Sequence, residues 1–284
     1  MSAQPSFDRH IKSDLVPGHD PEKYCQVMAR NARLMRLTLG HVARVAPYAG
    51  NAPRLPTEPP SAEDYANAVH EILAAVSPTR DVWLFAYGSL IWNPACDFIE
   101  TRLGTAHGWR RSFCLGWDRW FRGSEKHPGL MLSLDRGGQC RGVAYRLPPD
   151  AIEANLERLF RREIRTTSKA HLPRWVNVAT STGKLRAIAF VINRKGTRYV
   201  GGLSLDEIAA TLAVAAGPVG SMADYLCSTV RHLEELELHD RQLWRLQELV
   251  AERIEAAAGD GRGRTSHHKI APNADAESSG SGSG

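Results

Sequence analysis

The sequence lacks any hydrophobic run long enough to cross a bilayer, which takes about 18–20 consecutive apolar residues. Its start, Met1–Pro5, also has neither the basic flank nor the apolar segment of a secretory signal. Both absences predict a cytoplasmic protein without a membrane partner. The chain has 284 residues, of which 43% are hydrophobic and 24% charged, so it can bury a substantial core in one large domain or two small ones.

Cysteine is scarce and follows no pairing pattern. Five cysteines are an odd number, and the absence of a C-x-x-C pair argues against a disulfide framework or a zinc knuckle. The histidines show no ligand spacing such as H-E-x-x-H, and His267–His268 stand in a polar tail. We therefore expect no metal, and mostly buried, reduced thiols at Cys25, Cys96, Cys114, Cys140 and Cys227.

Charge of one sign is nowhere concentrated. The 36 Lys and Arg residues less the 31 Asp and Glu residues leave +5, and this excess is spread along the chain. Nucleic-acid binders usually gather their basic residues on one face, so nucleic-acid binding is only a weak alternative. Arg110–Arg111 and Arg161–Arg162 are expected to be solvated or to pair within the chain. The sequence also lacks a P-loop lysine and the glycine repeat of a dinucleotide site, and we expect no cofactor.

We expect three regions, with a main domain over residues 81–257. Residues 1–80 form a helical extension with a proline-rich arm. Asp20 caps a predicted helix from Pro21 to about Leu39, and five prolines between residues 46 and 60 exclude regular structure there. A second helix opens at Ser61. Residues 258–284 are rich in Gly and Ser, which is typical of a flexible tail or an expression tag.

The main domain is predicted to place strands first and helices later. Val82–Tyr87 is a nearly continuous apolar run, as in a strand buried on both faces. The other predicted strands are Trp109–Leu115, Leu130–Leu134, Gly142–Leu147, Trp175–Thr180 and Leu185–Asn193. Three helices follow, the first capped by Ser204 with Glu207, the second entered at Ser221 and the third beginning after Asp240. This order favours an α+β fold over a doubly wound sheet.

The tetrapeptide Tyr87–Leu90 follows the buried strand. Gly88 lets the backbone turn there so that successive N–H groups face one concavity, which suits a carboxylate or phosphate. On its own, such a turn is more often structural than functional.

Glu163 occupies an unusual place for a carboxylate. A helix after Asp150 puts Ile152, Leu156 and Leu159 on its buried stripe, and Glu163 comes four residues after Leu159. Burial would raise the pKa of this carboxyl group toward the range useful for proton transfer. The alternatives are that Glu163 faces solvent at the helix end or pairs with a neighbouring arginine, and the spacing does not decide between them.

Five motifs, in order, resemble the ChaC family of glutathione-specific γ-glutamylcyclotransferases. They are Phe85–Pro94, Arg111–Cys114, Arg122–Ser124 with Pro128–Gly129, Gly142–Leu147 and Arg162–Glu163. Leu172–Trp175 and Gly217–Leu226 are similar to the bacterial members. The resemblance therefore covers roughly Asp81 to Val250 and leaves residues 1–80 and the tail outside it.

This resemblance implies a small mixed β-barrel with flanking and C-terminal helices, and it implies that Glu163 is the catalytic acid/base. The residues implied to bind the substrate are Leu84, Phe85, Ala86, Tyr87, Gly88, Ser89, Leu90, Arg122, Gly123 and Ser124. The chain departs from the family twice. Ser124 stands where members commonly have Thr, and the segment after Glu163 lacks the Tyr that members carry there. His171 is the candidate for that position, and a change of substrate preference would follow from it.

The activity implied is the cyclisation of the γ-glutamyl group of glutathione to 5-oxoproline, with release of Cys-Gly. It needs no metal or nucleotide, because the α-amine of the substrate is its own nucleophile. Two alternatives stay open. An enzyme of the same fold acting on other γ-glutamyl amino acids or γ-glutamylamines would share Glu163 and the glycine turn. A non-catalytic binding protein on the same barrel would keep the turn without needing a buried carboxylate.

Overall fold

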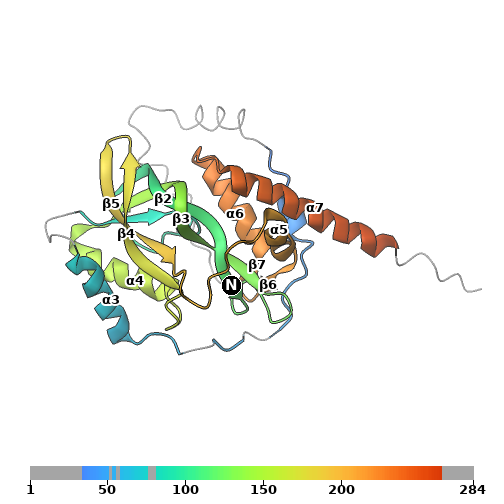
Figure 1. Cartoon of the computed structure of the whole chain (residues 1–284), viewed down its shortest axis with the longest axis horizontal. Coiled ribbons are helices and arrows are strands. Elements are labelled where there is room, and N and C mark those ends of the chain that lie inside the picture. Colours follow the sequence, from blue (N-terminus) through green and yellow to red (C-terminus); the bar gives the residue numbers. More distant parts are fainter. Residues whose placement is uncertain (1–33, 51–52, 56–57, 76–80, 264–284) are drawn as a thin grey trace, which may run out of the picture.

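The computed structural model describes residues 34–50, 53–55, 58–75 and 81–263, and the side chains of residues 259–263 are not included. Its centre is a closed barrel of five strands in the order β1-β3-β2-β4-β5. The strands are β1 (Trp83–Ala86), β2 (Glu100–Asp118), β3 (Gly129–Arg146), β4 (His171–Thr180) and β5 (Gly183–Ile192). Strand β1 runs antiparallel to β3 and parallel to β5, so the barrel is mixed. The expected α+β fold with a small mixed barrel is confirmed (Figure 1).

Strands β2 and β3 are much longer than the sequence indicated. The two predicted segments 130–134 and 142–147 belong to one strand, β3, which pairs with β2 from Gly129 to Arg146. The residues between them include Gly137 and Gly138, with φ of 99° and 70°, opposite a register shift in β2 at Gly108, whose φ is 81°. Glycine adopts positive φ without a steric penalty. These glycines therefore bend the strand pair instead of ending it.

Helix α4 (Ile152–Glu163), preceded by the 3₁₀ turn η2 (Pro149–Ala151), lies between β3 and β4. The three helices expected at the end of the domain follow β5: α5 (Leu205–Val214), α6 (Met222–Glu235) and α7 (Arg241–Gly263). The caps at Ser204 and Ser221 are confirmed, because each side chain accepts a hydrogen bond from the amide three residues later. Two short strands, β6 (Ala216–Gly217) and β7 (Gly220–Ser221), lead into α6. Helix α7 continues past Ala257, where the sequence placed the end of the domain.

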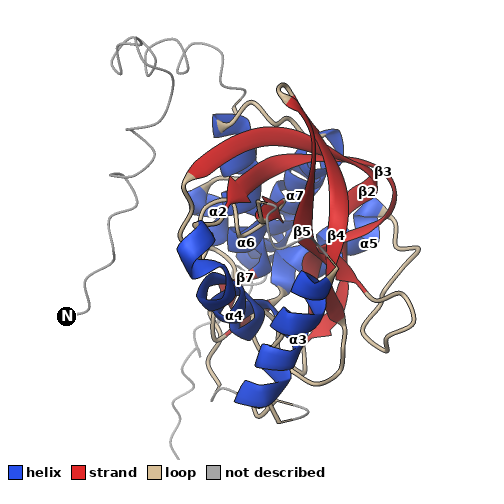
Figure 2. Ribbon diagram, turned by 90° about the vertical axis from the view of Figure 1, so that its left-hand side faces the viewer, coloured by secondary structure: helices blue, strands red, loops and turns tan. Residues whose placement is uncertain are grey.

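Helix α3 (Ala62–Ala74) packs beside α4 and β4 (Figure 2). Ser61 caps it as predicted, and Tyr65 and Val69 are buried. The Tyr65 hydroxyl donates to the carbonyl of Ile164 over 2.8 Å, at the end of α4. The indole N–H of Trp175 in β4 donates to the carbonyl of Ile72 over 2.8 Å. This part of the N-terminal extension therefore shares the core of the barrel domain.

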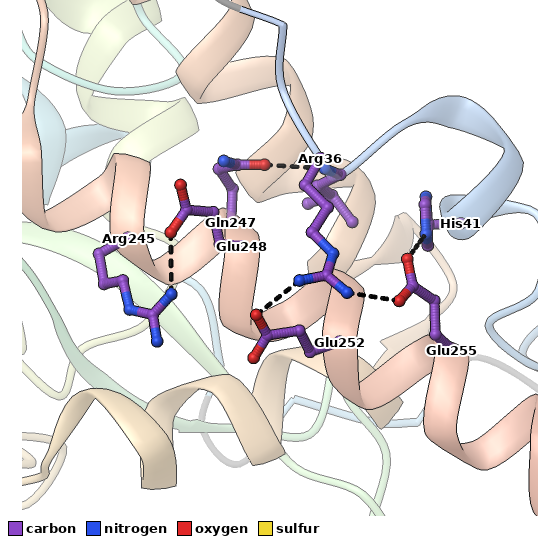
Figure 3. A network of polar contacts seen from close by, with 8 residues as sticks. Arg36, His41, Arg245, Gln247, Glu248, Glu252 and Glu255 are labelled. Atoms are coloured by element: carbon purple, nitrogen blue, oxygen red, sulfur yellow. Dashed lines mark hydrogen bonds and ion pairs between the residues drawn. The ribbon is translucent and has the colours of Figure 1, made fainter.

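The predicted helix from Pro21 to Leu39 is wrong over residues 34–38, and its residues 21–33 lie outside the described part of the chain. Residues 34–38 are irregular and lead into the short helix α2 (Leu39–Val42). Leu37 is buried, and its amide donates to the Gln247 side chain over 2.8 Å. Arg36 contacts Glu252 and Glu255 on α7 (Figure 3). Docking on α7 thus replaces helical hydrogen bonding here.

The described residues also test the expectations about membrane spans and cysteines. No helix among them is long and apolar enough to pass through a membrane. Cys114, Cys140 and Cys227 are buried free thiols and Cys96 is half-buried, as expected, whereas Cys25 lies outside the described residues. His267–His268 and the tail from residue 264 also lie outside them.

Candidate active site

Strand β1 delivers the Tyr87–Leu90 turn to the barrel end. Leu84, Phe85 and Ala86 have no exposed surface, so their side chains belong to the core and their backbone fixes the position of the turn. After the strand, the amide of Ile91 donates to the carbonyl of Gly88 over 2.8 Å, which closes the turn. Among the described residues, no backbone group accepts from the amides of Gly88, Ser89 or Leu90.

A buried arginine holds the start of this turn. Arg111 lies on β2, its side chain is 2% exposed, and its Nε donates to the carbonyl of Tyr87 over 2.6 Å. Its other nitrogens donate to the carbonyl of Arg141 and, over 2.5 Å, to the carboxylate of Asp240 just before α7. The guanidinium thereby connects β2, β3, the turn and the start of α7.

Glu163 is the last residue of α4 and lies beside the turn. Its side chain is 15% exposed, which agrees with the interpretation that it continues the buried stripe and disagrees with a solvent-facing helix end. Among the described residues its carboxylate forms an ion pair with Arg162 Nε at 3.3 Å and lies 3.7 Å from His171 Nδ1, so the expected pairing with a neighbouring arginine also holds. Arg162 also donates to Ser89 Oγ over 3.2 Å and to the carbonyl of Asn93. One guanidinium therefore joins Glu163 to the turn.

His171 is the first residue of β4, and its Nδ1 faces the Glu163 carboxylate. Its Nε2 lies 3.1 Å from the hydroxyl of Tyr87, which donates to the carbonyl of Phe190 over 2.7 Å. The result is a chain of polar contacts from Glu163 through His171 to the first residue of the turn.

Burial dominates the electrostatics of this cluster. It raises the pKa of Glu163 against the opposing charges of Arg162 and Arg165. Burial also lowers the pKa of His171 to about 4, which keeps its imidazole neutral at pH 7. The pKa of Tyr225 is raised by burial and by the nearby charge of Glu163. A carboxyl group with a raised pKa is suited to general acid/base chemistry.

Tyr225 closes the site from α6. A Cβ on Gly88 would lie 3.3 Å from the Tyr225 hydroxyl, so the glycine leaves room for this side chain. The guanidinium of Arg122 lies over the Tyr225 ring, 5.3 Å from its centroid, and donates to Asp224 over 3.0 Å. Arg122 is thus held against α6, beside Tyr225.

Gly123 and Ser124 shape the loop between β2 and β3. The carboxylate of Asp118, at the end of β2, accepts from the Arg122 amide over 2.7 Å. A Cβ on Gly123 would lie 2.0 Å from the carbonyl oxygen of Asp118 and 2.3 Å from the Gly129 nitrogen, which only glycine permits. Ser124 Oγ accepts from the His127 amide over 3.1 Å. The structure therefore places Ser124 in a tight turn two residues beyond Arg122.

The sequence reasoning missed Arg111 and Tyr225 as parts of the site. Both lie within motifs that were noticed, but a sequence pattern does not show that α6 and β2 converge on one turn. The pair Arg110–Arg111 was expected to be solvated or paired, and the second of these holds for Arg111. Within the described residues, no three His, Cys, Asp or Glu side chains gather in a way that would hold a metal ion.

The fold defines a class of protein. A solved structure from yeast, described as a γ-glutamylcyclotransferase specific to glutathione, superposes with a TM-score of 0.55 at 21% identity, covering 61% of this chain and 96% of the yeast chain. The two proteins therefore share a fold. The family model of ChaC-like proteins matches residues 82–253, and the chain belongs to this family.

Two relatives show how far the sequence similarity extends. A glutathione-specific γ-glutamylcyclotransferase of Escherichia coli is 39% identical over 181 residues, which is 63% of this chain and 77% of the relative. The Arabidopsis thaliana γ-glutamylcyclotransferase 2-1 is 30% identical over 182 residues, 61% of this chain and 84% of the relative. The family match begins at residue 82, so residues 1–80 lie outside it, as expected.

Proposed function

We propose that this chain is a cytoplasmic, glutathione-specific γ-glutamylcyclotransferase that converts glutathione to 5-oxoproline and Cys-Gly. The observation that carries the proposal is the placement of Glu163, a buried carboxyl group of raised pKa that Arg162 joins to the Tyr87–Leu90 turn. The 39% identity to the Escherichia coli enzyme supports glutathione as the substrate.

The reaction is intramolecular, so positioning supplies much of the acceleration. The α-amine and the γ-carbonyl belong to the same glutamyl residue and form a five-membered lactam when the chain is folded back. Well-oriented intramolecular reactions reach effective molarities of about 10⁵–10⁸ M. In this proposal, the amides of Gly88, Ser89 and Leu90, from which no described backbone group accepts, hold the γ-glutamyl group in that conformation and stabilise the oxyanion.

Glu163 carries the protons. It takes one from the α-ammonium, and the resulting amine attacks the γ-carbon. The attacking nitrogen loses its second proton as the lactam forms, while the amide nitrogen of the leaving peptide gains two and departs as an ammonium when its bond to the γ-carbon breaks. The two protons lost equal the two gained, so one carboxyl group is sufficient. Such acid/base catalysis contributes about 10²–10⁴-fold.

The neighbouring side chains supply binding. Arg162, which contacts the turn, and Arg122, which lies over the Tyr225 ring, are cations that suit the carboxylates of glutathione. Arg111 acts through the turn, because it holds the carbonyl of Tyr87. Gly123 and Ser124 fix the loop that presents Arg122.

The test is incubation of the purified full chain with glutathione, with detection of 5-oxoproline and Cys-Gly. We expect both products in equal amounts without added metal or nucleotide. Faster turnover of γ-glutamyl-alanine or a γ-glutamylamine would refute the substrate and retain the chemistry. Activity that EDTA abolishes and zinc restores would refute the metal-free mechanism, and no product from any γ-glutamyl compound would favour the binding protein.

A further inference from the structure

His171 has no task in the mechanism above, although it touches both ends of the site. Its side chain is 9% exposed and lies between Glu163 and Tyr87, at 3.7 Å and 3.1 Å from their nearest oxygens. The ring also packs against Phe190, with 5.5 Å between ring centroids. A side chain held on this many sides has a fixed orientation, so each of its two nitrogens can be assigned.

The contacts of Tyr87 determine which nitrogen of His171 carries the proton. A phenol has one proton, and Tyr87 donates it to the carbonyl of Phe190, which can only accept. The Tyr87 oxygen can therefore only accept from His171, so Nε2 is protonated. Because the imidazole is neutral at pH 7, with a pKa of about 4, Nδ1 is unprotonated and directs its lone pair at Glu163.

A lone pair facing a carboxyl group favours the protonated form of that group. The other groups that act on this pair are Tyr87 after β1, Tyr225 on α6, Arg198 after β5 and the arginines at the end of α4. The positive charge of Arg198 disfavours protonation of His171, and the backbone carbonyls of Phe190 and Glu163 favour it. At 3.7 Å, Nδ1 and Oε2 are too far apart for a hydrogen bond. Contacts between catalytic groups are often this long before the substrate binds and shorten in the complex.

We propose that His171 is a positioning residue for Glu163: its unprotonated Nδ1 accepts a hydrogen bond from the carboxyl group while Glu163 holds the proton taken from the substrate. The proton stays on Glu163 until the departing nitrogen receives it, and His171 keeps the carboxyl group oriented in the interval. This inference rests on the proposed function, because it assigns a partner to the acid/base named there.

Two substitutions test the contributions of the two His171 nitrogens separately. In His171→Gln the amide reaches the place of Nε2 and keeps the contact with Tyr87, but nothing faces Glu163. In His171→Asn the amide oxygen takes the place of Nδ1 and keeps an acceptor for Glu163. The measurement is kcat/KM for glutathione against pH, whose acidic limb reports the ionisation of Glu163 in the free enzyme.

For His171→Gln, loss of the acceptor lowers the pKa of Glu163. We expect the acidic limb to move to lower pH by about half a unit to one unit, with a lower plateau because the base is weaker. For His171→Asn we expect the limb to stay at its original pH. The proposal is overturned if the acidic limb of His171→Gln lies at the same pH as that of the unchanged enzyme. It is also overturned if the acidic limbs of both variants shift equally. If only His171→Asn folds, a displaced limb in that variant overturns it.

Two controls complete the design. His41→Ala removes another contact between a histidine and a glutamate, 2.9 Å from Nε2 to Glu255, outside the site, and should leave the limb in place. Glu163→Gln tests the proposed function separately. If Glu163→Gln retains turnover, the acid/base assignment fails. If it is inactive while the limb of His171→Gln is unmoved, only the role of His171 fails.

Discussion

Asp135 and Glu163 are both largely buried carboxylates on the barrel domain, but their surroundings have opposite effects. The Asp135 side chain is 1% exposed and accepts from Arg194 Nε over 2.6 Å, from Arg110 over 2.9 Å and from the Arg136 amide over 2.8 Å. Burial alone would raise the pKa of Asp135, yet the hydrogen bonds and charges of its partners lower it. Within the described part of the chain, the Glu163 carboxylate has one ion pair, at 3.3 Å from Arg162, and a longer contact with His171, and its pKa is raised.

The difference shows how a structural carboxylate is distinguished from a reactive one. A buried charge that has several short hydrogen bonds is stabilised as an anion and is inert as a base at neutral pH. A buried carboxyl group with few partners takes up a proton readily, and its environment disfavours the charge that it carries at pH 7. Burial is common to both residues, so burial alone does not identify the reactive group.

The sharpest way to break this comparison is Glu163→Gln. The substitution preserves shape and hydrogen-bonding capacity but removes the titratable proton, so turnover of glutathione should fall at least about 10²-fold while the protein stays folded. Steady-state kinetics with thermal melts measure both. A folded variant that makes 5-oxoproline at nearly the original rate would remove Glu163 from the mechanism. Asp135→Asn is the matched control, and its kcat should be close to the original value.

Asp135→Asn should instead reduce stability. The amide nitrogen would face the two guanidinium groups that the carboxylate now binds, so we expect the free energy of unfolding to fall by about 1–3 kcal/mol. The carboxylate contributes stability above its unfolded pKa of about 3.9, and that contribution is lost as pH falls through its lowered folded pKa. Urea unfolding at pH 7 is the measurement. A variant as stable as the original would mean that the arginines contribute nothing to the fold.

The pH dependence of stability should have the opposite sign at Glu163. Because its folded pKa is raised, the original protein is favoured below the unfolded pKa of about 4.3 and loses that advantage as pH rises through the folded pKa. Relative to the original, Glu163→Gln should therefore gain stability between about pH 4 and neutral pH. Urea unfolding of both proteins across this range gives the difference. A difference that is constant with pH would show that the pKa of Glu163 is unshifted.

Part of this arrangement could be predicted from the sequence, because it depends on local rules. Helix periodicity offered the buried stripe of α4 as one of the positions open to Glu163, and capping residues marked the starts of α3 and α5. The family resemblance gave the barrel and the turn. Residues 135–141 seemed to divide two strands, since glycines and charges are typical of turns, but pairing with β2 keeps β3 continuous.

The partners of Glu163 could not be derived locally. His171 begins β4, Tyr87 follows β1 and Tyr225 lies on α6, and only the closure of the barrel brings them together. Likewise, residues 34–38 continue a helical pattern, but the burial of Leu37 against α7 and the hydrogen bond to Gln247 favour an irregular segment. Tertiary contacts of this kind override local propensity.

Glu157→Gln should have the smallest effect and tests whether position on α4 matters. Glu157 lies six residues, or about 1.7 turns, before Glu163. Its side chain is 44% exposed, and it accepts from Arg161 over 2.5 Å. An exposed pair of this kind contributes little, and Arg161 keeps a second contact, since its guanidinium lies 4.7 Å from the ring centroid of Tyr65. We expect both stability, within about 0.5 kcal/mol, and turnover to be unchanged. Thermal melts and glutathione kinetics of Glu157→Gln and Glu163→Gln, measured side by side, test this expectation. An equal loss of turnover in the two variants would show that the charge of α4, and not the buried position of Glu163, controls activity.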